Sequence, residues 1–216
     1  MRILLDVCDK FASDFSVIFN SSKSKCLVIL PKSAKRFGLC DYPVFTIGGN
    51  VIEYVDEYPH LGHLITCNLN DEADIAQRRF TMIGQINSVL CYFGKLDKII
   101  KSQLLKIYCS SFYGCELWDL WNPYLEKFCS SWRVGVRRAW NLPRNTQSSV
   151  LHVLCNSLSV EDEICHRFLS FVNSCLTSEC TLISFVARYG ALYADMLSPL
   201  GRNNYGFVAE DFAWVI

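Results

Sequence analysis

The sequence lacks three features that would place it in a common class of proteins. No apolar run approaches the roughly 20 residues that a helix needs to cross a bilayer, so a membrane partner is not expected. None of the 12 cysteines lies three positions from another, as the Cys-x-x-Cys spacing of structural zinc sites requires. The charge is balanced at 21 Lys and Arg against 21 Asp and Glu, so the chain as a whole is not a polycation.

The cysteines are spread through apolar stretches of helical pattern, and no signal peptide is recognised before them. Reduced, buried thiols in an intracellular protein of the cytoplasm or nucleus explain this pattern better than a disulfide framework. His60 and His63 are the nearest approach to a metal-binding pair. They lie in a strand-like segment without further ligands nearby, so no metal site is predicted.

The balanced charge hides an asymmetry along the chain. Residues 1–150 hold 18 Lys and Arg against 14 Asp and Glu, a net of +4, whereas residues 151–216 hold 3 against 7, a net of −4. The cations of the first part cluster in residues 23–36 and again in residues 133–144. Either a polyanionic partner or plain solvation explains such clusters.

The front of the chain predicts one helix followed by a small antiparallel sheet. Apolar residues recur at helical spacing over residues 4–15. The runs FSVIF (15–19) and KCLVIL (25–30) are predicted to be strands joined by a turn at residues 20–23. VFTIGGNVIEYV (44–55) predicts a hairpin around its two glycines, and YPHLGHLI (58–65) predicts another short strand.

From residue 70 onward the apolar period is helical. Acids crowd residues 71–74, as a helix start favours, and one apolar stripe then runs to residue 93, about six turns on. Further helices are predicted over residues 98–121, 124–140, 148–155, 159–176 and 181–197. The predicted class is therefore α+β, with a helical remainder. Four tryptophans are predicted to be core residues rather than stacking platforms: Trp118, Trp121, Trp132 and Trp140.

Several segments resemble, in the expected order, the reverse transcriptases of non-LTR (LINE-type) retrotransposons. FSVIFNSSKSKCLVI resembles motif D, in which a strand leads into an Asn-x-x-Lys-[Ser/Thr] turn, and YPHLGHLI resembles motif E, the primer grip. NDEADIAQRRFTMIGQINSVLCYF is similar to the thumb helix, while FYGCELWDLW and WRVGVRRAWNLPRNTQ resemble the post-thumb segment. Many relatives carry a His where this chain has Gln147, so the role of that His does not carry over. The resemblance implies a palm remnant (1–66), a helical thumb and post-thumb (67–145) and a C-terminal helical segment (146–216).

The resemblance implies roles for two turns of the palm remnant. Lys23, in the motif D-like turn, would act as a general acid or fixed cation toward the pyrophosphate leaving group. The alternative is an ordinary exposed lysine at a turn. Leu61 and Gly62 would bring bare backbone close to the primer end, or would simply form a tight bend between strands.

Nucleic-acid contacts are implied for five arginines. Arg78 and Arg79 would contact phosphates of the primer–template duplex, and the alternative for Arg79 is an ion pair with the acids of residues 71–74. Arg133, Arg137 and Arg138 lie at positions i, i+4 and i+5 of one predicted helix. They would form a face that contacts nucleic acid, or one that is merely solvated.

The catalytic carboxylates of the family have no counterpart in this sequence. Intact family enzymes hold Mg²⁺ with three Asp residues, two of them in a Tyr-x-Asp-Asp hairpin, which would precede residue 1. Tyr193-Ala194-Asp195 is one residue short of that motif and lies on the wrong side of the other matches.

The chain is therefore expected to be a fragment that has no cofactor or small-molecule site of its own. It would bind an RNA template and a DNA primer without polymerising, and would leave apolar edges exposed. The alternatives are a catalytically inert nucleic-acid-binding module and a helical interaction protein.

Overall fold

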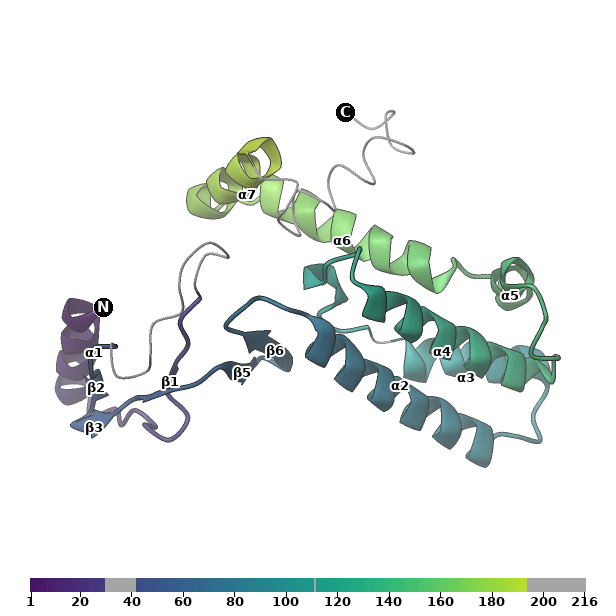
Figure 1. Cartoon of the computed structure of the whole chain (residues 1–216), viewed down its shortest axis with the longest axis horizontal. Coiled ribbons are helices and arrows are strands. Elements are labelled where there is room, and N and C mark those ends of the chain that lie inside the picture. The colour runs from purple at the N-terminus through teal and green to yellow at the C-terminus, as the bar shows by residue number, and fades with distance from the viewer. Residues whose placement is uncertain (30–41, 111, 194–216) are drawn as a thin grey trace. The chain divides into compact units, whose positions relative to one another are not determined.

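The structure is a computed structural model that describes residues 1–29, 42–110 and 112–193, with side chains as far as Gly190 (Figure 1). The chain divides into two compact units, Met1–Asn70 and Asp71–Ile216. The first unit combines one helix with short strands, and the second contains helices, so the predicted α+β class is confirmed. Among the described residues, no helix is long and apolar enough to cross a membrane.

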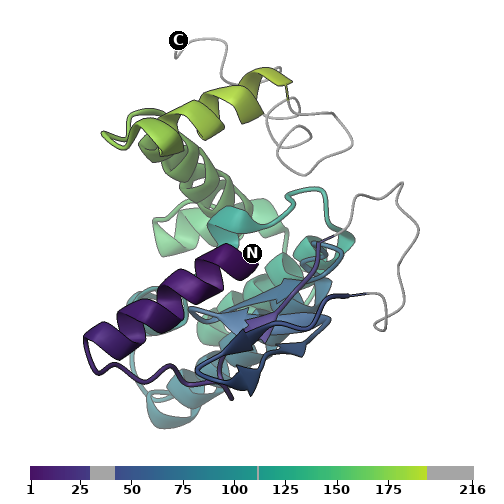
Figure 2. The same ribbon diagram turned by 90° about the vertical axis from the view of Figure 1, so that its left-hand side faces the viewer.

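The described residues of the first unit, 1–29 and 42–70, form one helix and three strand pairs. Figure 2 shows the same elements in a second view. Its elements are α1 (Arg2–Asp14), β1 (Lys25–Cys26), β2 (Thr46–Ile47), β3 (Asn50–Val51), β4 (Glu53–Tyr54), β5 (Glu57–His60) and β6 (His63–Thr66). The pairs β2–β3 and β5–β6 are antiparallel, whereas β1 pairs with β4 in parallel. The single antiparallel sheet that the sequence predicts is therefore divided into three two-stranded ladders.

Two hairpins of the first unit have the same kind of turn. Gly48 (φ 56°) and Gly49 (φ 75°) join β2 to β3, and Leu61 (φ 49°) and Gly62 (φ 80°) join β5 to β6. Positive φ at both central residues is the type I′ turn, whose twist matches that of antiparallel strands. The predicted hairpin around the glycines is confirmed. YPHLGHLI, predicted as one strand, instead contributes to both arms of a hairpin.

The predicted hairpin of residues 15–30 is wrong. Residues 17–20 are irregular, and the following strand is limited to Lys25–Cys26 in the part that the structure describes. The Asn20 side chain accepts hydrogen bonds from the Ser22 hydroxyl (2.6 Å) and from the Lys23 amide (3.1 Å). Such local side-chain bonds offer the backbone an alternative to a ladder, and here they close a turn.

Helix α1 has an apolar face that remains exposed. Every residue of α1 is exposed or only partly buried, and its face carries Ile3, Leu4, Val7 and Phe11 with 51–79% of their surface exposed. The Asp9 carboxylate accepts a 2.8 Å hydrogen bond from the Gly48 amide, which joins the helix to the β2–β3 turn.

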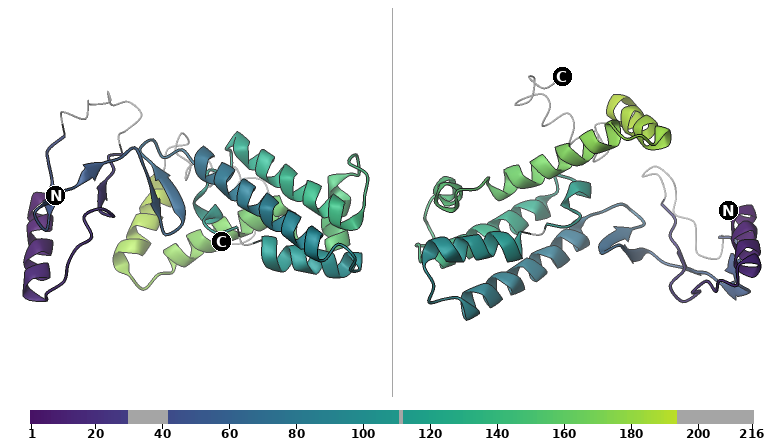
Figure 3. Two further views of the ribbon diagram at one scale, coloured as in Figure 1. Left: turned by 90° about the horizontal axis from the view of Figure 1, so that it is seen from below. Right: turned by 180° about the vertical axis from the view of Figure 1, so that it is seen from behind.

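The second unit is a set of helices around one apolar core (Figure 3). Its elements are α2 (Glu72–Tyr92), α3 (Lys98–Cys109), the 3₁₀-helix η2 (Cys115–Leu117), α4 (Pro123–Trp140), α5 (Ser148–Cys155), α6 (Val160–Leu176) and α7 (Thr181–Tyr193). Asp97, Asn122 and Ser159 cap the N-termini of α3, α4 and α6 through their side-chain oxygens. The stripe predicted on α2 is confirmed as far as Leu90, since Ile75, Met82 and Ile86 are buried and Ile83 and Leu90 are partly buried. Phe93, the last residue of the predicted stripe, is 39% exposed.

The helix predicted over residues 98–121 ends early, at Cys109. Gly114 then adopts a left-handed conformation (φ 84°), and the chain turns through η2 to bury Trp118 completely. Trp132 and Trp140 pack partly buried against the core, whereas Trp121 is 59% exposed, so its predicted core position is wrong. The segment Ala194–Asp195, the end of the last predicted helix and the cations Lys32, Lys35 and Arg36 lie outside the described residues.

All eleven described cysteines are free thiols. Cys109, Cys115 and Cys129 are buried, whereas Cys91 and Cys180 are exposed, so burial is not general. Burial raises the pKa of Cys109 to about 11 and that of Cys115 to about 12, since the apolar core disfavours a thiolate. These thiols are inert core residues.

Candidate nucleic-acid interface

The turn that carries Lys23 is built by local hydrogen bonds. The Lys23 amide donates to both the backbone carbonyl and the side-chain oxygen of Asn20, each at 3.1 Å, and the Ser24 hydroxyl donates to the same carbonyl at 3.0 Å. The Lys23 side chain is exposed. The turn therefore holds its backbone fixed while presenting an ammonium group to solvent.

A second contact fixes this turn to the hairpin that carries Leu61 and Gly62. The Tyr58 hydroxyl, on β5, donates a 2.5 Å hydrogen bond to the carbonyl oxygen of Lys23. Leu61 and Gly62 are exposed at the tip of that hairpin, and His60 and His63 face each other in register on either side of it. Within residues 1–29, 42–110 and 112–193, no group of three or more His, Cys, Asp or Glu is placed to hold a metal ion.

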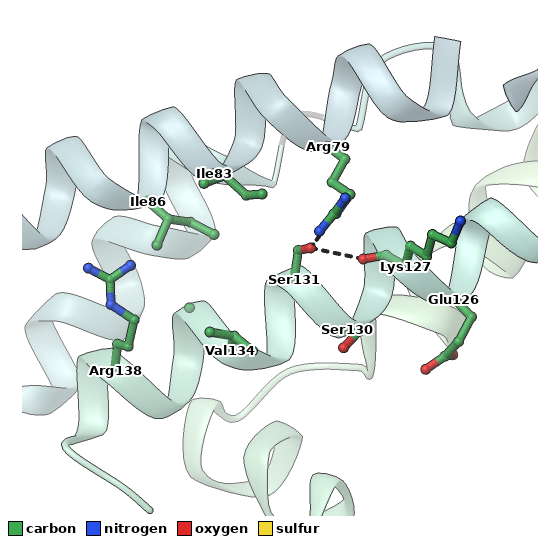
Figure 4. A pocket seen from close by; sticks show the side chains of 10 residues that line it. Arg79, Ile83, Ile86, Glu126, Lys127, Ser130, Ser131, Val134 and Arg138 are labelled. Atoms are coloured by element: carbon green, nitrogen blue, oxygen red, sulfur yellow. Dashed lines mark hydrogen bonds between the residues drawn. The ribbon is translucent and has the colours of Figure 1, made fainter. Parts of the chain in front are cut away.

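A groove of about 480 Å³ lies between α2 and α4 of the second unit (Figure 4). Ile83, Ile86 and Val134 give it apolar walls, and Gly135 allows the Ile86 side chain to pack against the backbone of α4. Its polar lining consists of three cations, one acid and two hydroxyls: Arg79, Lys127, Arg138, Glu126, Ser130 and Ser131. The groove thus combines apolar walls with an excess of positive charge.

Arg79 enters the groove from α2. Its Nε donates a 2.6 Å hydrogen bond to the Ser131 hydroxyl on α4, and Figure 4 shows the side chain reaching across to it. The Arg79 side chain therefore has a partner on the facing helix, in place of the first-turn acids that were its alternative partners. Arg78 lies elsewhere, with its guanidinium carbon 5.3 Å from the centre of the Tyr113 ring.

The three arginines of α4 have three different surroundings. Arg133 forms ion pairs with Glu126 and with Glu161 on α6. Arg137 donates to the Thr146 carbonyl at 2.8 and 3.2 Å and to the Ser148 hydroxyl at 3.0 Å.

Arg138 alone of these three lines the groove, where it donates a 2.6 Å bond to the Asn87 side chain. The structure thus separates the residues that the sequence groups on one face. Ser131, the partner of Arg79, and Arg138 are seven positions apart on α4, which separates the two cations by about 10 Å along the groove.

Two features of the second unit were not predicted from the sequence. Lys127 lines the groove, and its ammonium lies 3.9 Å from the centre of the Tyr124 ring. The first-turn acids of α2 hold the loop after η2: Asp71 accepts from the Asp119 amide and Asp74 from the Trp118 indole, both at 2.8 Å. The sequence predicts for these acids an interaction with the helix dipole or an ion pair with Arg79, and neither role indicates that they hold this loop.

A second cavity, of about 330 Å³, lies between α4, α5 and the start of α6. Several of its polar lining groups are bonded to one another. Arg133 pairs with Glu161, and the Ser159 hydroxyl donates to Asp162 at 2.6 Å.

Comparison of the chain with protein-family models, with curated proteins and with solved structures found no match.

Proposed function

We propose that the chain is the palm-edge, thumb and post-thumb part of a non-LTR retrotransposon reverse transcriptase, and that it binds the RNA–DNA primer–template without catalysing polymerisation. The observation that carries this proposal is the α2–α4 groove, where Arg79, Lys127 and Arg138 gather from two helices beside a single acid. The arginine guanidinium matches the geometry of a phosphate group and binds it through paired hydrogen bonds.

The resemblance of the first unit supports the same function. The Lys23 turn and the Leu61–Gly62 tip belong to segments similar to motif D and the primer grip, and Tyr58 binds the backbone of the first from the second. Because this hydrogen bond joins the two segments, they can offer the Lys23 ammonium group and the backbone of the Leu61–Gly62 turn to the same nucleic acid. The sequence contains no adjacent pair of aspartates, so a two-metal polymerase centre is not expected within it.

Binding through phosphate contacts would not depend on the nucleotide sequence and would weaken as the salt concentration rises. Cations that contact phosphates release condensed counterions, so affinity falls as salt concentration rises. Two or three phosphate contacts would lower the affinity about 12- to 40-fold between about 50 and about 200 mM salt.

The test is fluorescence anisotropy of a labelled RNA–DNA hybrid titrated with the full chain across this salt range. The proposal expects saturable binding with the stated salt dependence. Polyglutamate serves as a polyanion without phosphates and should compete poorly. Absence of hybrid binding, or equal competition by polyglutamate, would contradict the proposal.

A further inference from the structure

Two arginines of the α2–α4 groove are held by neutral groups. Arg79 donates to the Ser131 hydroxyl, and Arg138 donates to the side-chain oxygen of Asn87, both at 2.6 Å. A neutral partner orients a guanidinium group without cancelling its charge. A phosphate in the groove would therefore meet the full positive charge of both arginines.

Glu126, the one acid among the described residues that line the groove, has a different kind of partner. Its carboxylate pairs with the guanidinium of Arg133, seven positions later on α4 and therefore on nearly the same face of this helix. Figure 4 shows the Glu126 side chain extending away from Arg79. Arg133 does not line the groove but lines the cavity between α4, α5 and the start of α6. The acid is thus held by a cation from outside the groove.

Arg133 also pairs with Glu161 on α6, so two acids share one guanidinium group. The three groups together carry a net charge of −1, from one charge of +1 and two of −1, and without Arg133 they would carry −2. Glu126 exposes 70% of its side chain, and an ion pair with so exposed a partner adds little to stability. Its effect on a nearby phosphate is a separate matter, because an uncompensated carboxylate repels the phosphate more than a paired one does.

We infer that Arg133 is a positioning residue of the groove, which holds the Glu126 carboxylate and offsets its charge so that phosphates can bind beside Arg79 and Arg138. This inference rests on the proposed function and assigns a role to a residue outside the groove. The sequence predicts that Arg133 contacts nucleic acid or is merely solvated. The structure instead commits its guanidinium to two carboxylates. Arg133 acts on the bound nucleic acid through Glu126.

The first test follows the side-chain Nε–H signals of the arginines by NMR while the RNA–DNA hybrid is added to the isotope-labelled full chain. The signals of Arg79 and Arg138 should shift, because these two side chains contact phosphates, and the signal of Arg133 should shift much less. A shift of the Arg133 signal as large as that of Arg79 would indicate a direct contact and would overturn the inference. This measurement uses the unmodified chain, so it does not depend on how a substitution affects folding.

The second test is a double-mutant cycle, in which fluorescence anisotropy measures hybrid binding at about 50 mM salt. Arg133→Gln should weaken binding about 2- to 6-fold, as one uncompensated charge about 4–10 Å from a phosphate does in water. In a chain that already carries Glu126→Gln, the same substitution should change neither the affinity nor its salt dependence. Arg144→Gln, which removes the same charge from an exposed loop, is the control and should have the same effect with or without Glu126→Gln.

Two results of the cycle would overturn the inference. One is unchanged affinity in Arg133→Gln, which would show that Glu126 does not oppose binding. The other is an equal loss with and without Glu126→Gln, which would show that Arg133 attracts the phosphates itself. Thermal melting verifies that each variant is folded, and the NMR result decides if Arg133→Gln is not. Absence of hybrid binding by the unmodified chain would contradict the proposed function, whereas binding together with either result would contradict the role of Arg133 alone.

Discussion

The hydroxyl group of Tyr58 donates a 2.5 Å hydrogen bond to the carbonyl oxygen of Lys23, 35 residues earlier in the chain. Tyr58 lies in the β5–β6 hairpin, and Lys23 lies in a turn that Asn20 closes. This bond joins the two segments that resemble motif D and the primer grip. It leaves the Lys23 side chain exposed while it restrains the backbone beneath it.

Replacing Tyr58 with Phe should loosen the Lys23 turn. The change removes one hydrogen bond worth about 0.5–1.5 kcal/mol, so amide exchange at Lys23 and Ser24 should speed up about 2- to 12-fold. Hydrogen exchange followed by NMR measures this directly. Tyr92→Phe, at a residue 81% exposed on α2, is the matched control and should change neither rate. Unchanged exchange in Tyr58→Phe would show that the bond does not restrain the turn.

Two glycines of the second unit should respond in opposite ways to alanine. A Cβ at Gly135 would lie 2.7 Å from Cδ1 and 3.1 Å from Cγ2 of Ile86, whereas a Cβ at Gly84 would meet nothing within 4 Å. Both changes gain about 1 kcal/mol of helix propensity, but only Gly135→Ala must displace a neighbour, at about 1–3 kcal/mol.

Urea unfolding should therefore show Gly135→Ala to be less stable than Gly84→Ala by about 1–3 kcal/mol. Ile86→Val removes the nearest atom and should reduce this difference when combined with each alanine variant. Equal stability of the two alanine variants would mean that α2 and α4 approach less closely than described.

The buried carboxylate of Asp74 should be essential for stability. It accepts a 2.8 Å hydrogen bond from the Trp118 indole, and both side chains are almost fully buried. Asp74→Ala leaves the indole N–H without this acceptor and should lower the free energy of unfolding by about 1–3 kcal/mol or more. Asp74→Asn keeps an acceptor oxygen and should cost less. Chemical denaturation measures the free energy of unfolding of both variants. An equal decrease in the two would contradict the assigned role of this hydrogen bond.

The core thiols should make the fold less stable at alkaline pH. Burial raises the pKa of Cys109 from 9.0 to about 11, so the folded chain keeps a proton that the unfolded chain loses above its lower pKa. The stabilisation that the Cys109 thiol contributes is complete below pH 9.0 and decreases as the pH rises from 9.0 toward about 11.

Unfolding midpoints in urea at about pH 8 and about pH 10 measure the decrease, which should be smaller in Cys109→Ala. Equal decreases in both proteins would exclude this thiol as a source. Among the eleven described cysteines, alkylation of the native chain should modify the exposed Cys91 and Cys180 first.

Local patterns in the sequence predicted most helices and one hairpin. The N-terminal acids and apolar stripe of α2 and the glycine pair of the β2–β3 turn are signals within a few residues, and the structure follows them. The early end of α3 could not be predicted in this way. It depends on the burial of Trp118 against Asp74, a contact between residues 44 positions apart.

The contacts of the arginines at the candidate interface also depend on residues distant in the sequence, so local patterns could not predict them. Helical spacing put Arg133, Arg137 and Arg138 together, but the partner of each is supplied by a different part of the chain: Glu161, Thr146 and Asn87. A long side chain can bond to any of several groups, and the tertiary fold determines which of these groups lies close enough. Lys127 was missed for the same reason, since the groove that it lines exists only when α2 and α4 pack together.

Phosphate binding in the groove is tested most directly by the salt dependence of hybrid binding in the double variant Arg79→Gln/Arg138→Gln. Both residues line the groove, whereas Arg144, an exposed arginine in the loop after α4, does not, so Arg144→Gln is the matched control. If the groove binds phosphates, the double variant should bind the RNA–DNA hybrid more weakly and reduce the slope of log affinity against log salt by about two, while the control keeps the original slope. An unchanged slope in a double variant that melts as the unmodified chain does would contradict the proposed binding of primer–template in the groove.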